Sequence, residues 1–279
     1  MKRERELVQL DRDHPGFRDT AYRARRDHIA RLASEWRQGD PLPRADYTED
    51  EHRVWRTVLQ ALGPLHARYA SRLYREAWPE IALSPEHIPE LTQLNPRLQA
   101  YAGFSLVPVA GLIDARAFMS ELSESTFLAT QYVRHHATPL YTPEPDVIHE
   151  LVGHAPILSS PEHARVNRLF GEAARVVGPK ALQALVRVYW YAIEFGVVRG
   201  EKGLEVVGAG LLSSFGELGR FEAHARLRPF SIEEIARTDY DPTRFQATLF
   251  VAQSEQIFLE DLTRWLEGLL EDATHGLDR

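Results

Sequence analysis

The chain has 279 residues, of which 44% are hydrophobic and 26% charged, so it can bury a substantial core. It contains no cysteine, which excludes iron–sulfur clusters, thiolate zinc sites and disulfides and leaves His, Asp and Glu as the strong metal ligands. The formal charge of −7 argues against general affinity for nucleic acid. No long apolar window is present, so we expect a cytoplasmic protein that binds neither nucleic acid nor membrane.

The first hundred residues show mainly helical patterns. Apolar residues recur at helical spacing over 20–37, and four arginines in this stretch predict a solvated helix face: Arg23, Arg25, Arg26 and Arg31. A capping box at Thr48 and Glu51 begins a second predicted helix, which we expect to end at Gly63-Pro64 and to be followed by another over 65–78. Four further prolines between 79 and 96 predict short helices and turns.

The rest of the chain adds short strand patterns between helices. Strands are predicted at 104–109, 125–130, 204–207 and 248–252, and helices at 114–122, 161–177, 179–198, 213–226 and 254–270. The prolines of 141–145 require an extended segment, after which a helix begins near Asp146. No repeat or polar linker divides the sequence. We therefore expect one mainly α globular domain over 1–279, with many helices, a few short strands and a loosely ordered extension at 1–10.

Two histidines five residues apart, His149 and His154, flank Glu150 and Gly153. The zinc-protease pattern needs a spacing of four, because five steps of about 100° overshoot one face of an α-helix. The pair can still chelate an ion if the helix ends or distorts between them, and Gly153 and Pro156 favour such a break. The alternative is a pair of hydrogen-bonded histidines near a helix end.

A third ligand must come from His, Asp or Glu, and Glu194 is a lone carboxylate in a strongly apolar, aromatic stretch. Burying it is costly unless it binds a cation or an arginine such as Arg187 or Arg199. Two histidines and one carboxylate form the facial triad of non-heme Fe(II) oxygenases, although these ligand types do not distinguish iron from zinc.

Several longer motifs, in the same order, resemble the catalytic domain of the pterin-dependent aromatic amino acid hydroxylases. They occupy residues 11–17 (DRDHPGF), 131–135 (QYVRH), 141–154 (YTPEPDVIHELVGH), 208–217 (GAGLLSSFGE) and 249–254 (LFVAQS). The resemblance spans nearly the whole chain and implies a single catalytic domain.

The resemblance also implies roles for individual residues. His149, His154 and Glu194 match the iron ligands, and Glu150 joins them as a catalytic residue. The implied substrate-binding residues are Arg134 for the carboxylate, Thr142 and Ser213 around the amino acid, and Trp190, Pro145 and Phe195 around its ring. The implied pterin-side residues are Leu112 and Ile113 of the loop 109–113, Phe118, Glu150 and Tyr189.

Structural alternatives stand beside several of these assignments. Arg134 could instead pair with Asp146 or Glu144, Thr142 could act as a turn hydroxyl, and Ser213 could act as a helix N-cap. Aromatic residues in a helix more often serve as core, so Trp190 and Phe195 carry that alternative too.

The implied activity is an Fe(II)- and tetrahydropterin-dependent hydroxylation of an aromatic amino acid by O₂, with tetrahydrobiopterin as one such pterin and L-phenylalanine as the expected substrate. Tryptophan or tyrosine hydroxylation is the alternative within the family. A zinc hydrolase with Glu150 as general base and a non-catalytic amino acid binding protein are alternatives from other classes. We see no regulatory domain and no tetramerising tail in this sequence, and expect a monomer or weak dimer.

Overall fold

The computed structural model describes residues 10–111, 113–201 and 203–275. Its first two helices begin at side-chain caps. Asp19 caps α1 (Thr20–Glu35), and the predicted capping box between Thr48 and Glu51 begins α2 (Glu49–Tyr69). The expected break at Gly63-Pro64 is wrong: α2 continues through Pro64, since a proline removes only one helical hydrogen bond, and the chain breaks instead at Ala70.

A second group of elements surrounds a small parallel sheet. The helices are α3 (Arg72–Ile81), α4 (Leu91–Ala102) and α5 (Ala115–Leu122), and the strands are β1 (Ser105–Pro108) and β2 (Thr126–Ala129). Both strands and α5 lie where the sequence predicts them. Two of the prolines expected to end helices, Pro79 and Pro96, lie inside α3 and α4.

The middle of the chain is helical and contains two π-helical segments. The order is η1 (His149–His154), α6 (Ala155–Ser159), α7 (Pro161–Val176), α8 (Pro179–Tyr189) and η2 (Trp190–Glu194). The helix predicted over 179–198 therefore ends early, and its last residues belong to the strand β3 (Val197–Gly200).

A four-stranded sheet packs beside these helices, with strand order β4-β3-β6-β5. Strand β4 (Gly203–Val206) pairs antiparallel with β3, whereas β6 (Thr248–Ala252) lies parallel to both β3 and β5 (Arg226–Pro229). The sequence did not predict β3 or β5, and the helix expected over 213–226 is two short helices instead, α10 (Phe215–Leu218) and α11 (Phe221–His224). Helix α9 (Ala209–Ser213) precedes them, and α12 (Ile232–Ile235) follows β5.

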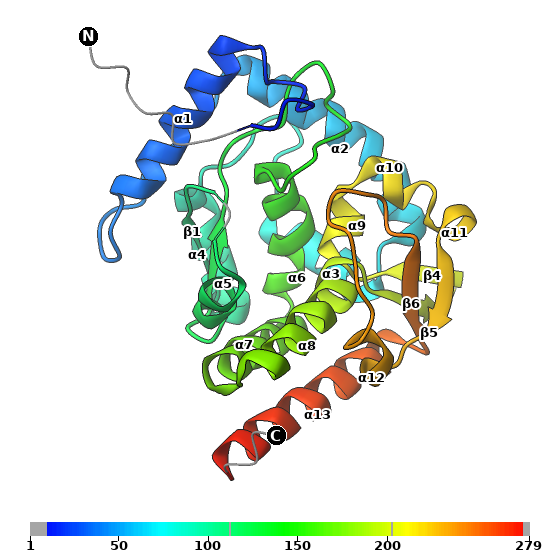
Figure 1. Ribbon diagram of the computed structural model, residues 1–279. Coiled ribbons are helices and arrows are strands. Elements are labelled where there is room, and N and C mark those ends of the chain that lie inside the picture. Colours follow the sequence, from blue (N-terminus) through cyan, green and yellow to red (C-terminus); the bar gives the residue numbers. More distant parts are fainter. Residues whose placement is uncertain (1–9, 112, 202, 276–279) are drawn as a thin grey trace.

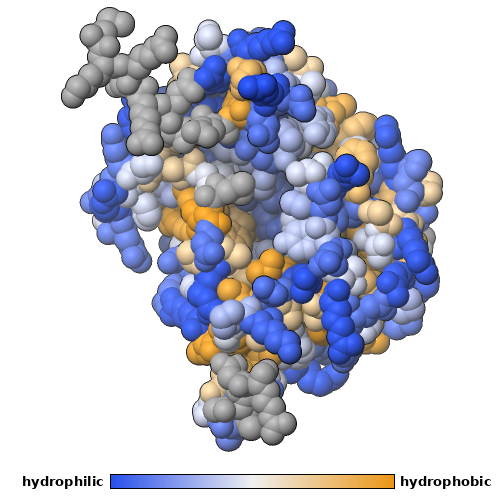
Figure 2. Space-filling view, in the orientation of Figure 1, coloured by the Kyte–Doolittle hydropathy of each residue, from blue (hydrophilic) through white to orange (hydrophobic). Residues whose placement is uncertain are grey.

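The last helix, α13 (Glu255–Thr274), crosses beneath α7 and α8 and packs on α7 (Figure 1). One continuous core joins the helices to both sheets, with Trp55, Phe127, Phe170 and Phe250 fully buried. This confirms the prediction of a mainly α fold with a few short strands. Hydrophilic side chains cover much of the face in Figure 2, between separate hydrophobic patches. Among the described residues, no helix is both long and apolar enough to cross a bilayer.

Candidate metal centre and substrate site

Three side chains converge from two helical segments that are 40 residues apart in the sequence. The Nε2 atoms of His149 and His154 lie 3.0 Å apart, and the carboxylate of Glu194 lies 3.1 Å from His154 and 3.6 Å from His149. The two arginines that the sequence offered as partners of Glu194 lie elsewhere: Arg187 pairs with Asp239, and Arg199 is exposed. The structure therefore brings the three predicted ligands together.

The π-helical segments explain how a spacing of five residues serves one site. A π-helix closes its hydrogen bonds from residue i to i+5, so His149 and His154 return to the same face. Of the two possibilities that the sequence left open, the helix distorts rather than ends: it widens into a π-helix and continues into α6. Gly153 is needed for close approach instead, because a Cβ at this position would lie 2.6 Å from the carbonyl oxygen of Ala209.

Hydrogen bonding orients the lone pair of His149 toward the centre. Ser213 Oγ donates to the Ala209 carbonyl at 2.9 Å and lies 2.9 Å from His149 Nδ1. Since the hydroxyl proton is used, His149 Nδ1–H must be the donor and Nε2 is left unprotonated. Burial also lowers the pKa of His149 to about 4, which keeps the ring neutral. A neutral imidazole whose other nitrogen is hydrogen-bonded is the usual form of a metal-binding histidine.

The spacing of the donor atoms fits an open-faced metal site. Ligands at about 2.1 Å and at right angles are about 3.0 Å apart, whereas a tetrahedral arrangement separates them by about 3.4 Å. Two of the three donor separations are 3.0 and 3.1 Å. Glu194 is ready to ligate, because the two histidines lower its pKa against the opposing effect of burial. The residues present therefore fit a metal ion with two nitrogen ligands and one carboxylate.

Glu150 lies beside the centre but is held by other groups. Its Oε1 accepts hydrogen bonds from the backbone N–H and the hydroxyl of Thr130, at 3.1 and 2.8 Å. The side chain is buried, and this burial raises its pKa to about 7. Such a carboxyl can hold or release a proton near neutral pH.

Arg134 makes the ion pair with Asp146 that the sequence offered as an alternative. Its Nε and Nη2 donate to the two carboxylate oxygens at 2.9 and 2.8 Å, and both residues are buried. Burial would raise the pKa of Asp146, but the charge and hydrogen bonds of Arg134 hold it below the usual value. The pair uses two of the five guanidinium N–H groups, so it does not preclude a carboxylate ligand on the others.

The extended segment 141–145 is fixed from the N-terminal side of the fold. Thr142 Oγ1 donates to the carbonyl of Glu144 at 2.8 Å, as a turn hydroxyl does. The Glu144 carboxylate binds Arg26, whose guanidinium stacks over the Tyr132 ring. Arg26 is therefore buried, and the prediction that it lies on a solvated helix face is wrong; this arginine reaches inward to hold the segment that carries Pro145.

An aromatic wall stands near Glu194. The Trp190 ring stacks on Tyr240, with centroids 4.3 Å apart and planes 13° apart, and contacts Phe195 on another side at 4.8 Å. Phe195 is buried, whereas Trp190 is partly exposed, as a residue that faces a ligand must be.

The predicted pterin-side residues form a second aromatic group. Phe118 packs edge-on against Phe127 and Tyr189, and the Phe127 ring lies 4.5 Å from that of His154. Ile113, which precedes Phe118 in the sequence, is 40% exposed. Leu112 lies outside the described residues.

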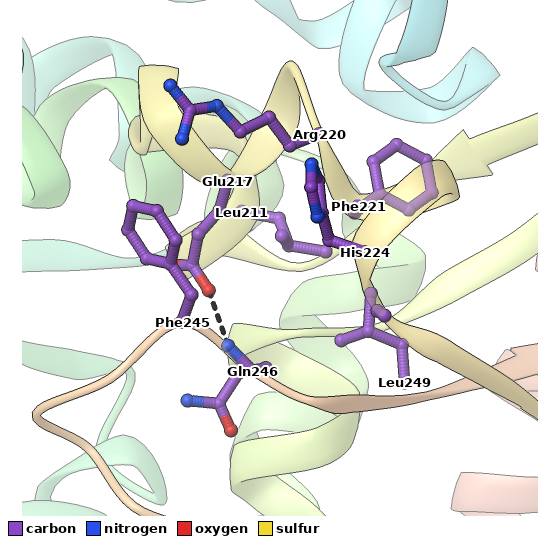
Figure 3. Close-up of a pocket in the computed structure, with 9 residues that line it drawn as sticks. Leu211, Glu217, Arg220, Phe221, His224, Phe245, Gln246 and Leu249 are labelled. Carbon is purple, nitrogen blue, oxygen red and sulfur yellow. Dashed lines mark hydrogen bonds between the residues drawn. The ribbon is translucent and has the colours of Figure 1, made fainter.

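A separate cavity of about 150 Å³ opens beside α10 and α11, with a mostly apolar lining (Figure 3). Glu217 points across it, and its carboxylate accepts the backbone N–H of Gln246 at 2.8 Å. None of the predicted site residues lines this cavity.

The comparisons with known proteins decide the family. The family model of biopterin-dependent aromatic amino acid hydroxylases matches residues 4–273. The chain belongs to this family. It is 39% identical to phenylalanine-4-hydroxylase of Bos taurus over 88% of this chain, and 40% identical to the chloroplastic phenylalanine 4-monooxygenase of Pinus taeda over the same share. The chain spans 56% of the bovine relative and 70% of the pine relative.

Solved structures of this hydroxylase family share the fold. Phenylalanine hydroxylase of Chromobacterium violaceum with bound iron(III) and 7,8-dihydrobiopterin superposes with a TM-score of 0.77 at 29% identity, covering 88% of this chain and 92% of that one. The enzyme of Legionella pneumophila gives 0.74 at 27% identity over 82% and 92% of the two chains. Membership in the family does not favour the zinc hydrolase reading.

Three contributors to the candidate site were missed from the sequence. Thr130, which holds Glu150, and Gln246, which accepts from Trp190, have no local pattern that marks them. Tyr240 stacks on Trp190 from a loop 50 residues later in the chain. Only a prediction of which loops meet in space could have found them.

Proposed function

We propose that this chain hydroxylates L-phenylalanine to L-tyrosine, using O₂, Fe(II) and a tetrahydropterin such as tetrahydrobiopterin. The observation that carries the proposal is the convergence of His149, His154 and Glu194, whose donor atoms lie 3.0, 3.1 and 3.6 Å apart. The membership of the chain in a biopterin-dependent family and the phenylalanine hydroxylases among its relatives support the choice of cofactor and substrate.

The metal would be held by the three triad residues, which leave its opposite face open for other ligands. Bound together, iron and the pterin would supply the electrons that activate O₂. Ser213 keeps the proton of His149 on Nδ1, and Thr130 holds the Glu150 carboxyl beside the pterin side of the centre. Glu150 would then accept or return a proton there, because its pKa lies near 7.

On the substrate side, Arg134 would bind the amino acid carboxylate through the N–H groups that Asp146 does not use. Thr142, Pro145, Ser213, Trp190 and Phe195 would surround the rest of the amino acid substrate. Leu112, Ile113, Phe118 and Tyr189 are proposed for the pterin. A substrate ring or a pterin ring packed against these side chains would exclude water from the metal centre.

A competition assay tests the proposed substrate. The protein is loaded with Fe(II), supplied with tetrahydrobiopterin and O₂, and given equal concentrations of phenylalanine, tyrosine and tryptophan. We expect tyrosine from phenylalanine as the main product. Preferential formation of 5-hydroxytryptophan or DOPA would assign the chain to another substrate of the family.

The domain and assembly remain sequence predictions: one catalytic domain over 1–279, a monomer or weak dimer, and a cytoplasmic location. Light scattering of the purified chain tests the assembly. A mass near 31.8 kDa or twice that value agrees with it, and a stable tetramer contradicts it.

A further inference from the structure

The side chain of Gln246 makes three hydrogen bonds in one orientation. Its Oε1 accepts the indole N–H of Trp190 at 3.0 Å, and its Nε2 donates to the carbonyls of Asp241 and Arg244 at 3.1 and 2.9 Å. Exchanging the oxygen and the nitrogen would set an N–H against the indole N–H and an oxygen against two carbonyls. The partners therefore fix which way the amide points.

The backbone of the same residue is held from the opposite side. In the cavity of Figure 3, the Glu217 carboxylate accepts the Gln246 N–H at 2.8 Å. Glu217 itself is anchored in α10, where its N–H bonds to Ser214 Oγ. Gln246 thus stands between a fixed helix and the Trp190 ring and cannot shift without breaking bonds on both sides.

Two adjacent residues of η2 hold the two ends of one loop. The Tyr191 hydroxyl donates to the carbonyl of Asp239 at 2.8 Å, and Trp190 donates to Gln246, so the loop 239–246 is closed against the helix that carries Glu194. Tyr240 of this loop stacks on the Trp190 ring. Stacking fixes the plane of a ring but allows it to slide and rotate in that plane, whereas the N–H bond fixes the remaining direction.

We propose that Gln246 is a positioning residue for the amino acid substrate: it locks Trp190 and the loop 239–246 into one wall and so sets which aromatic ring the site accepts. This inference rests on the proposed function, in which Trp190 borders the substrate ring. Gln246 acts through Trp190 and its own loop.

The test uses the Fe(II)-loaded full chain and two substitutions. Gln246→Leu removes all three side-chain bonds, while Gln246→Glu keeps an acceptor for the indole but loses both donors. For Gln246→Leu we expect the KM for phenylalanine to rise about tenfold, the KM for tetrahydrobiopterin to stay unchanged, and the preference for phenylalanine over tryptophan to fall. Gln246→Glu should fall between Gln246→Leu and wild type. Arg220→Gln is the control, because Arg220 is an exposed residue that lines the same cavity; its KM values and substrate preference should match those of wild type.

Two readouts separate failure of this inference from failure of the proposed function. The first is the NMR resonance of the Trp190 indole N–H, assigned with Trp190→Phe, which should shift in Gln246→Leu without any turnover. The second is phenylalanine binding by calorimetry. Wild type that binds no aromatic amino acid would overturn the proposed function. Wild type that binds phenylalanine, with equal affinity and equal selectivity in Gln246→Leu, would overturn the positioning role. If Gln246→Leu does not fold, Gln246→Glu, which loses the two bonds to Asp241 and Arg244, must raise the KM for phenylalanine selectively.

Discussion

His149 and His154 are oriented by different means. A hydrogen bond from His149 Nδ1 to Ser213 decides where its other nitrogen points, whereas the Nδ1 of His154 is buried with no hydrogen-bond partner in the described part of the chain. His154 is positioned by packing against the Phe127 ring and by its contact with Glu194. The centre therefore depends on a single hydroxyl for the direction of one of its two nitrogen ligands.

Replacing Ser213 by Ala removes that hydroxyl with little change in volume. We expect the affinity for Fe(II) to fall about ten- to a hundredfold, because groups that orient a metal-binding histidine contribute on this scale. Metal titration followed by dialysis and metal analysis measures the change. Ser214→Ala is the matched control, since Ser214 caps α10 without touching His149. Equal iron affinity in the two variants would contradict the role of Ser213.

For individual residues, the sequence predicts those with a distinctive chemical role. Two histidines, and a carboxylate in an aromatic stretch, mark the triad because no cysteine competes for the metal. The bond from His149 to Ser213 spans 64 residues, and the one from Trp190 to Gln246 spans 56. Nothing local in the sequence reports these pairings, because they depend on where α9 and the loop 239–246 come to lie.

Among the elements, α9 lies unusually close to η1. A Cβ on Gly153 would meet the Ala209 carbonyl, and one on Gly208 would lie 2.4 Å from the Glu194 carbonyl. Glycines thus allow the turn that precedes Ser213 to approach both metal-binding segments. The sequence does not predict the short helix that begins at Ala209, because five residues are too few to show a helical period.

Gly153→Ala should push α9 away from η1. We expect the free energy of unfolding to fall by about 1–3 kcal/mol, the usual cost of forcing an added methyl group against fixed atoms, together with weaker iron binding. Gly63→Ala is the control, because a Cβ there meets no atom within 4 Å and alanine favours a helix. Chemical denaturation of both variants measures the difference, and a Gly153→Ala protein as stable as Gly63→Ala would show that the contact is not tight.

A largely buried carboxylate joins α13 to the rest of the helices. The Glu255 carboxylate contacts His163 Nε2 at 3.0 Å and accepts from the Ser71 hydroxyl at 2.7 Å and the Leu73 N–H at 3.2 Å. Burial would raise the pKa of Glu255, but these three partners hold it below the usual 4.5. The carboxylate therefore stabilises the fold above about pH 4.5, and this contribution is lost as the pH falls through the lowered pKa.

Glu255→Gln should lower the free energy of unfolding at pH 7 by about 1–3 kcal/mol, since hydrogen bonds to a charged acceptor are replaced by weaker ones. The difference from wild type should shrink as the pH drops below 4.5. Urea denaturation at several pH values measures it. A difference that stays constant with pH would show that the charge of Glu255 is not what holds α13.

Helices with side-chain caps are the elements that the sequence predicts best, as α1, α5 and α13 show. The errors share a cause: a neighbour in space overrides the local signal. Strand β3 has only four residues and follows a long helical pattern, and its pairing with β4 and β6 defines it. The π-helical segments also escape prediction, because the same apolar residues satisfy an α-helical pattern.

In the whole molecule, the helices and the four-stranded sheet bring three distant parts of the chain to one centre. Segment 130–154 supplies two of the proposed ligands and the proposed carboxylate-binding arginine, η2 supplies Glu194 and Trp190, and α9 supplies Ser213. Helix α1 holds the segment 141–145 through the ion pair between Arg26 and Glu144. Removing any one of these segments would therefore take away residues that belong to the same site.

We propose that this triad binds iron for a pterin-dependent hydroxylation of phenylalanine. The most direct measurement is tyrosine formation from L-phenylalanine by the metal-stripped protein, reconstituted with Fe(II) or Zn(II), with and without tetrahydrobiopterin. Tyrosine should form only with Fe(II) and the pterin together, and Glu194→Ala should reduce the rate at least about a hundredfold while keeping the helical circular dichroism of wild type. Tyrosine formation supported by Zn(II) in place of Fe(II), or unchanged in Glu194→Ala, would contradict the proposed role of the triad.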